Sequence, residues 1–203
     1  MSDGDGLSAR LHLSNKWQLW LGPGIFLLLW LLLYATGARV DFTRERMLQF
    51  VGPQELASSG WSDLLLIHSQ PPGFNALLKI TDQFANHSNS VLLAIFAAMT
   101  ILGLWMTADL VLQLTGSVRW ASGAGILAAL VPGTTFYSFW IFYTTPTAFL
   151  LMTTVWGMVR STRTNSVWAL TVSVVALVLA ALTRSSIVWI LVVIWLLLNL
   201  KTI

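Results

Sequence analysis

Long runs of apolar residues constrain this chain more than any other feature of its sequence. A helix needs about 20 mainly apolar residues to cross a bilayer. The first such run, residues 17–36, reads WQLWLGPGIFLLLWLLLYAT, and the later candidates are residues 90–112, 120–142, 146–159 and 167–200. The sequence therefore predicts an all-α fold, a polytopic transmembrane helix bundle of about six spans that occupies residues 17–203.

The last apolar run is too long for one span, and Arg184 interrupts it within the string ALTRSS. An arginine at the centre of a bilayer costs about 2.5–3.5 kcal/mol on insertion scales. A turn at the membrane surface removes most of that cost, so we expect two spans that meet near Arg184. The alternative is one long tilted helix whose Arg184 faces a polar cavity, and totals of five or seven spans also stay open.

The composition agrees with a bilayer as solvent, because 56% of the residues are hydrophobic and only 9% are charged. Ordinary soluble domains carry about 25% charged residues. The absence of cysteine from the sequence excludes disulfides, thiolate nucleophiles and cysteine metal sites. The three histidines lack the spacing of a helical metal site. No basic stripe is present, so nucleic acid is not an expected partner.

The positions of lysine and arginine predict the topology. A polar and then basic tail, residues 1–16, precedes the first span, which we interpret as a retained signal anchor. With alternating spans, one side of the membrane receives a set of basic residues: Arg10, Lys16, Arg119, Arg160, Arg163 and Lys201. That side should be the cytoplasm, in a plasma, inner or organelle membrane. The loop of residues 38–89 then lies on the extracytoplasmic face.

This outer loop contains two amphipathic strings, FTRERMLQFV and WSDLLLIHSQ, which we expect to lie along the interface as short helices. Pro71 and Pro72 end the second string, because proline removes a backbone donor and pushes the preceding residue away from helix. Gly73 permits a close approach of the backbone. Asn75 should begin the next helix, with a side chain that can cap it.

Carboxylates and basic groups gather at the start of this loop. Asp41 follows the first span closely and can act as a general base toward an acceptor hydroxyl or amine. Arg44 and Glu45 follow three and four residues later and share its helical face. The guanidinium of Arg44 can hold a phosphate, and Asp41 with Glu45 could bind a divalent metal such as magnesium. The alternative is that these charges simply anchor the end of a span.

Other polar residues have plainer interpretations. Asp109 lies near the inner end of the second span and should be a solvated helix end. The eleven tryptophans indicate interfacial belts. Tyr137, Tyr143 and the string TTPT predict a tight outer turn between the third and fourth spans, and they could also line the mouth of a pocket. His68 alone is more typical of a hydrogen-bonded interface residue than of a base.

Several of these features in their order resemble one family. The string RVDFTR with Asp41 and Arg44 comes first, HSQPPGFN from His68 to Asn75 follows, and YSFWIFYTTPTAFLL and ALTRSSIVWIL come later. This arrangement resembles the GT-C superfamily of integral membrane glycosyltransferases, in particular the branch of protein mannosyltransferases and aminoarabinose transferases. The resemblance covers nearly the whole chain and corresponds to the N-terminal membrane module, either as a short member or as part of a longer one.

The resemblance implies transfer of a sugar from a polyprenyl-phosphate donor to an acceptor on the outer face. Asp41 would then deprotonate or orient the acceptor, and Arg44 or Arg184 would neutralise the lipid phosphate. The Pro-Pro bend would hold His68 and Gln70, with Asn75 beyond it, over the membrane surface where that phosphate sits.

Two other classes of function stay open from the sequence. A transporter or channel component places ionisable groups or broken helices inside the membrane, and Arg184 with the pair Pro132 and Gly133 fits that pattern. A non-catalytic membrane subunit or truncated fragment, partnered by a longer membrane protein, fits the short length of 203 residues.

Overall fold

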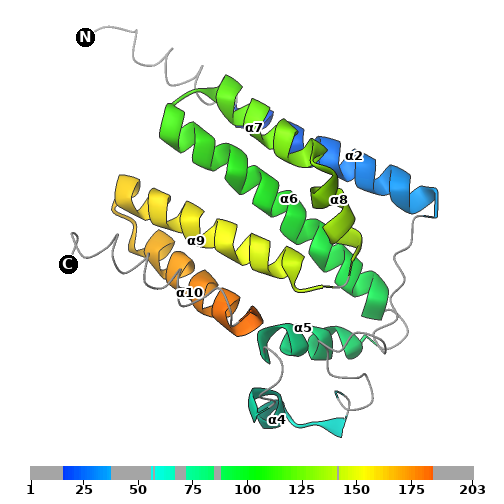
Figure 1. Ribbon diagram of the computed structural model, residues 1–203. Helices are drawn as coiled ribbons and strands as arrows, with labels where there is room; N and C mark the ends of the chain where they lie inside the picture. The colour runs from blue at the N-terminus through cyan, green and yellow to red at the C-terminus, as the bar shows by residue number, and fades with distance from the viewer. Residues whose placement is uncertain are drawn as a thin grey trace, which may run out of the picture.

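A computed structural model of the chain describes residues 16–37, 56, 58–66, 72–84, 88–140 and 142–184. All regular elements within these residues are helical, which confirms the all-α prediction for this part of the chain (Figure 1). In chain order they are η1 (Lys16–Trp20), α2 (Leu21–Ala35), α4 (Trp61–Leu66), α5 (Pro72–Asp82), α6 (Ser88–Thr115), α7 (Val118–Leu130), α8 (Pro132–Phe139), α9 (Thr144–Thr164) and α10 (Val167–Thr183).

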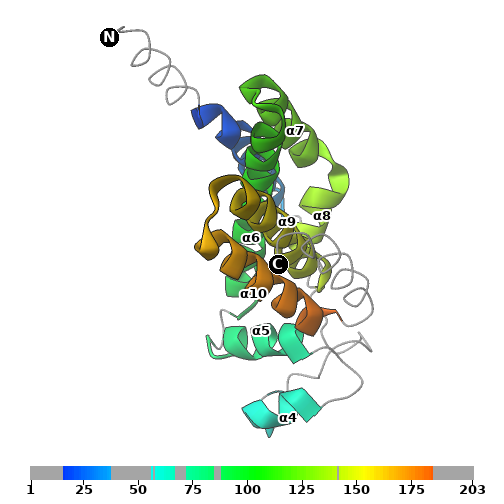
Figure 2. The same ribbon diagram turned by 90° about the vertical axis from the view of Figure 1, so that its left-hand side faces the viewer.

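The long helix α6 is the centre of the arrangement. Figure 1 shows α2 and α7 on one side of α6, and α9 followed by α10 on the other side. The short helices α4 and α5 lie together beyond the end of the bundle at which α6 begins, as both Figure 1 and Figure 2 show. α5 contacts α6 and α10, so it closes that end of the bundle.

Two tight turns at the opposite end connect neighbouring helices. Gly116, with a φ of 68°, follows α6, and the Ser117 side chain accepts a hydrogen bond from the backbone of Trp120 at the start of α7. Asn165, with a φ of 48°, follows α9, and the Ser166 side chain caps α10. A left-handed residue followed by a serine cap ends one helix and begins the next within two residues.

Small residues allow the helices to approach closely. A Cβ atom on Gly22 of α2 would lie 2.4 Å from the backbone of Gly125 in α7, so only glycine fits at that crossing. A Cβ atom on Gly157 of α9 would lie 2.8 Å from the carbonyl oxygen of Ala169 in α10. Near the second crossing, the buried Ser173 hydroxyl donates to the Thr154 carbonyl at 2.8 Å. Small residues and interhelical hydroxyl bonds are typical of helix packing in membranes.

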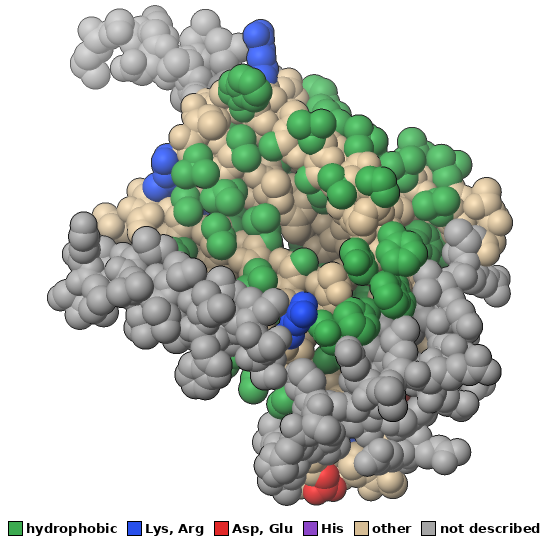
Figure 3. Space-filling view, in the orientation of Figure 1, with side chains coloured by type: hydrophobic (Ala, Val, Ile, Leu, Met, Phe, Trp, Pro, Cys, Tyr) green, Lys and Arg blue, Asp and Glu red, His purple; other side chains and the backbone are tan. Residues whose placement is uncertain are grey.

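Two helical segments of the described chain are long and apolar enough to cross a membrane, Lys16–Ala35 and Asn89–Thr115. α7 and α10 are apolar but shorter, with 13 and 17 residues. Large apolar side chains are exposed on several helices, among them Leu28, Leu127 and Val167. Figure 3 shows such side chains over much of one face of the molecule. A soluble monomer rarely exposes contiguous apolar surface on this scale.

The described helices differ in two respects from the predicted spans and agree with them in a third. The run of residues 120–142 is not one helix, because it breaks at Val131 into α7 and α8. α9 has 21 residues and extends beyond the predicted range of 146–159 at both ends. α10 ends at Thr183, which confirms that the helix stops at Arg184, and the residues after 184 lie outside the described part.

The glycine crossing between α9 and α10 makes a prediction about stability. We expect Gly157→Ala to destabilise the fold by roughly 1–3 kcal/mol, because its Cβ would overlap the Ala169 backbone and the helices must move apart. The matched control is Gly123→Ala in α7, where a Cβ meets nothing within 4 Å. Thermal unfolding in detergent should show a lower midpoint for Gly157→Ala alone. Equal midpoints for the two variants would contradict the packing described.

Candidate functional site

The structure describes two of the six predicted site residues. Asn75 lies in α5, and Arg184 follows the last residue of α10. The other four lie outside the described residues, so their predicted roles remain predictions: Asp41, Arg44, His68 and Gln70. Glu45, the second predicted metal ligand, also lies outside. Within the described residues, no group of three or more histidine or carboxylate side chains is placed to hold a metal ion.

Arg184 lies where three helices meet. Its backbone N–H donates to the Ala180 carbonyl at 2.9 Å, and this bond closes the last turn of α10. Its guanidinium carbon lies 5.1 Å from the centre of the Tyr143 ring, at the start of α9. The Tyr143 ring in turn meets Phe74 of α5 edge to face, with ring centres 6.4 Å apart. Arg184 is therefore held by a cation–π contact at the junction of α5, α9 and α10.

The Pro-Pro-Gly string brings α5 to this junction. Pro72 is the first residue of α5, a position where its missing N–H costs little. A Cβ atom on Gly73 would lie 2.9 Å from the carbonyl oxygen of Leu182, so the predicted close backbone approach is confirmed. Asn75 does not cap α5, contrary to prediction, because the helix begins three residues earlier at Pro72. Its side chain is instead buried, with 1% exposure.

The neighbouring segment is attached to α5 through Lys79. The Lys79 ammonium donates to the carbonyl oxygens of Leu56 and Ser59 and lies 5.5 Å from the centre of the Trp61 ring. Leu56 and Leu64 are buried in the same apolar cluster as Phe74 of α5. The described part of the predicted outer loop is thus folded onto the end of the bundle and contains short helices, as the sequence predicted.

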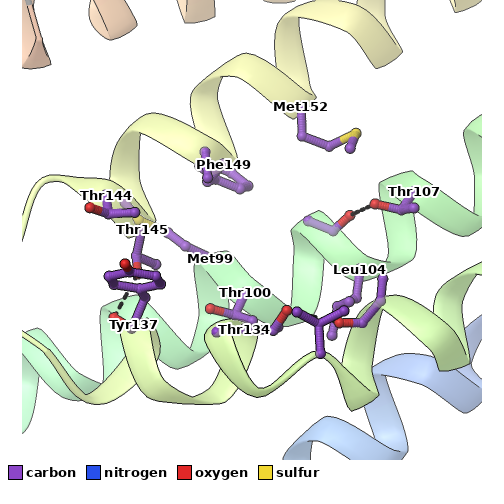
Figure 4. A pocket seen from close by; sticks show the side chains of 15 residues that line it. Met99, Thr100, Leu104, Thr107, Thr134, Tyr137, Thr144, Thr145, Phe149 and Met152 are labelled. Atoms are coloured by element: carbon purple, nitrogen blue, oxygen red, sulfur yellow. Dashed lines mark hydrogen bonds between the residues drawn. The ribbon is translucent and has the colours of Figure 1, made fainter.

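A cavity of about 400 Å³ lies between α6, α8 and α9 (Figure 4). In Figure 4, Phe149 and Met152 of α9 face Thr100 and Leu104 of α6 across this cavity. Four threonine hydroxyls in its lining donate to backbone carbonyl oxygens at 2.7–2.9 Å, those of Thr100, Thr107, Thr134 and Thr145. Because these hydroxyls are already engaged with backbone, the cavity offers a mainly apolar surface.

The break between α7 and α8 shapes one wall of the cavity. Pro132 has no N–H, so the carbonyl of Ala128, four residues earlier, lacks its helical partner. The Thr134 hydroxyl donates to that carbonyl at 2.8 Å and replaces the lost bond. Beyond α8, the Thr145 hydroxyl donates to the Tyr137 carbonyl at 2.7 Å across the turn into α9. The chain turns between α8 and α9, whereas the string TTPT that was predicted to form the turn is the first turn of α9. Tyr137 and Thr145 also line the cavity.

Asp109 is not the solvated helix end that the sequence predicted. Its side chain is 13% exposed and accepts hydrogen bonds from Gln113 Nε2 at 2.6 Å and Trp156 Nε1 at 2.8 Å. Arg160 lies 3.8 Å from the same carboxylate. The prediction failed because α9 packs along α6 and brings Trp156 and Arg160 to this carboxylate. The four-residue spacings, 109 to 113 and 156 to 160, place each pair on one face of its own helix, but no local pattern indicates that the two faces meet.

The comparisons with known proteins add no family to these observations. No protein-family model, no curated protein and no solved structure matches this chain. The resemblance to GT-C glycosyltransferases therefore stays a prediction from the sequence.

The guanidinium of Arg184 and the apolar cavity could each bind a part of a lipid phosphate. A guanidinium at the end of a helix bundle can bind a phosphate through charge-assisted hydrogen bonds. A cavity of this size with mainly apolar walls suits a hydrocarbon chain, since ligand pockets span about 300–1,000 Å³. Tyr143 contacts Arg184, and the next two residues, Thr144 and Thr145, line the cavity, so the start of α9 contributes to both features.

The bond that bridges the proline break can be tested directly. Thr134→Val keeps the shape of the side chain but leaves the Ala128 carbonyl without a partner, which should cost about 1–3 kcal/mol. Thr135→Val is the matched control, because the Thr135 hydroxyl makes no hydrogen bond within the described residues. We expect a lower thermal unfolding midpoint for Thr134→Val only. A midpoint equal to that of the control would show that the bridge contributes nothing.

Proposed function

We propose that the chain is an integral membrane protein of about six spans, with residues 1–16 in the cytoplasm and the loop 38–89 on the extracytoplasmic face. Two segments with the length and composition of membrane spans support this proposal, as do the apolar side chains exposed on their neighbours. The cations of the described chain also support it. Lys16, Arg119, Arg160 and Arg163 lie at the end away from α5, which is the end that we place in the cytoplasm.

We further propose that the protein is a glycosyltransferase that uses a polyprenyl-phosphate-linked sugar. The observation that carries this proposal is the junction of Arg184 with the start of α9, next to the apolar cavity. A polyprenyl phosphate has a charged head and a long hydrocarbon tail, so it can use both features together. The order of the sequence motifs supports the choice of a sugar donor over other lipid phosphates.

In the proposed reaction Asp41 accepts the proton of the acceptor hydroxyl or amine as that atom attacks the anomeric carbon of the sugar. The new glycosidic bond forms while the bond between the anomeric carbon and the phosphate oxygen breaks. The electron pair of the broken bond leaves with the lipid phosphate, and Arg184 stabilises the resulting negative charge. Arg44 would act on the same phosphate, while His68 and Gln70 would contribute to binding of the donor.

A transporter is the second candidate function, because one observation favours it. The interrupted helix α7–α8 lines the cavity, and transporters form their substrate sites from broken helices. The two candidates differ in their dependence on Asp41. Solute flux into proteoliposomes that survives loss of the Asp41 carboxylate would favour the transporter.

The catalytic prediction concerns Asp41. Asp41→Asn should abolish sugar transfer from a polyprenyl-phosphate donor while the protein still inserts into membranes, because the amide cannot accept the proton. Glu55→Gln removes a carboxylate from the same loop and serves as the matched control, with transfer retained. The measurement is the appearance of the glycosylated acceptor after reconstitution with the radiolabelled donor. Transfer by Asp41→Asn at the rate of the control would remove Asp41 from the mechanism.

The binding prediction concerns Arg184. Arg184→Gln should weaken binding of polyprenyl phosphate by about 10–100-fold, because a charge-assisted hydrogen bond contributes about 1.5–3 kcal/mol. Arg184→Lys keeps the positive charge but lacks the planar fork, so it should retain part of the affinity. Binding is measured by retention of polyprenyl phosphate on the full chain in native mass spectrometry. Unchanged retention by Arg184→Gln would place the phosphate elsewhere.

A further inference from the structure

The charges of the described chain are distributed unequally between the two ends of the bundle. Lys16 begins η1, Arg119 lies in the first turn of α7, and Arg160 and Arg163 lie near the end of α9. The starts of η1 and α7 and the end of α9 all lie at the end of the bundle opposite α5 (Figure 1). Asp109 is the one described carboxylate at that end, and it is paired with Arg160. The described part of that end therefore has four cations against one anion.

The other end differs, because basic and acidic groups balance among its described residues. Lys79 and Arg184 accompany Asp63 and Asp82 on α4, α5 and the end of α10. Figure 3 shows basic side chains near the end where α7 begins, and an acidic side chain near α4. Within the described residues, an excess of positive charge is thus a property of the first end.

Three exposed tryptophans lie next to the cations of this end in the sequence or at the start of a helix there. Trp120 and Trp168 are 72% and 75% exposed, next to Arg119 and at the start of α10. Trp17 is also exposed, beside Lys16. Exposed tryptophan is enriched at the level of lipid headgroups, where its ring contacts apolar chains while its N–H stays in a polar layer. Exposed tryptophan next to exposed cations therefore matches the chemistry of a lipid headgroup layer.

The turns hold these groups in fixed positions. The α6–α7 turn at Gly116 and Ser117 and the α9–α10 turn at Asn165 and Ser166 contain two residues each, with capped helices after them. Arg160 also lies 5.3 Å from the centre of the Trp156 ring. Arg119 and Arg163 are exposed and carry no ion pair within the described residues, so their guanidinium groups can bind an external anion.

We propose that this end of the bundle binds the headgroups of anionic phospholipids in the leaflet that it faces, through Arg119 and Arg163 together with Lys16 and the flanking tryptophans. The inference rests on the proposed membrane location but not on sugar transfer. Each basic residue near an anionic surface strengthens binding by about fivefold, and the attraction falls as salt is added.

The test is lipid selectivity of the purified full chain. The protein is mixed with equimolar phosphatidylglycerol and phosphatidylcholine, and the lipids retained on it are counted by native mass spectrometry. We expect a preference for phosphatidylglycerol that high salt reduces. The double variant Arg119→Gln with Arg163→Gln should lower the preference by roughly tenfold or more, since two charges are removed. The matched double variant Arg119→Lys with Arg163→Lys keeps both charges and should keep the preference.

Three results would overturn the inference. These are an absence of phosphatidylglycerol preference in the unaltered chain, an unchanged preference in the glutamine double variant, or an equal loss in the lysine double variant. Flotation with vesicles after alkaline extraction separates this failure from failure of the proposed membrane location. A chain that floats with vesicles yet lacks the preference contradicts this inference alone. A chain that does not float contradicts both.

Discussion

The close contact between α9 and α10 at Gly157 positions both ends of this bundle. Without a Cβ at that position, the Ala169 carbonyl and Ser173 pack directly against α9, and Ser173 adds a hydrogen bond to Thr154. In a membrane such packing replaces the hydrophobic effect, because lipid chains are as apolar as the helices themselves. The same hairpin brings Arg184 to Tyr143 at one end and places Trp168 beside the end of α9 at the other. The parts of both proposed sites that lie on α9 and α10 therefore depend on one helix contact.

The segment around Pro132 shows how the fold provides hydrogen-bond partners for its backbone in apolar surroundings. Pro132 removes one donor from the α7–α8 segment, and an unsatisfied carbonyl costs several kcal/mol in lipid. Thr134 supplies the missing donor to Ala128, and Thr145 does the same for Tyr137 at the next turn. The threonine hydroxyls that line the cavity thus donate to backbone carbonyl groups. For this reason a lining with several threonines can still present an apolar surface.

Local sequence patterns predicted where helices begin and end better than they predicted the contacts between helices. The end of a helix at Arg184 and the close approach at Gly73 follow from arginine desolvation and glycine, and the structure agrees. The turn predicted at TTPT lies a few residues earlier, because that string begins α9. The burial of Asn75 and the pairing of Asp109 were not predicted. Each depends on a neighbouring helix whose position no local pattern specifies. For the catalytic prediction at Asp41 the sequence remains the only source, because that residue lies outside the described part.

The two ends of the bundle have different chemistry, and that difference bears on topology. The orientation of the helices in the membrane would be set if Lys16, Arg119 and Arg163 lie at an anionic leaflet. Arg184 lies at the other end of α10 from Trp168 and would then face the opposite leaflet. The free-energy cost of its positive charge there is lowest if a lipid phosphate pairs with it. A positive charge on the side of the membrane where basic residues are disfavoured is retained most easily when it binds an anionic ligand. On this argument the position of Arg184 favours a ligand-binding role over a role as a helix anchor.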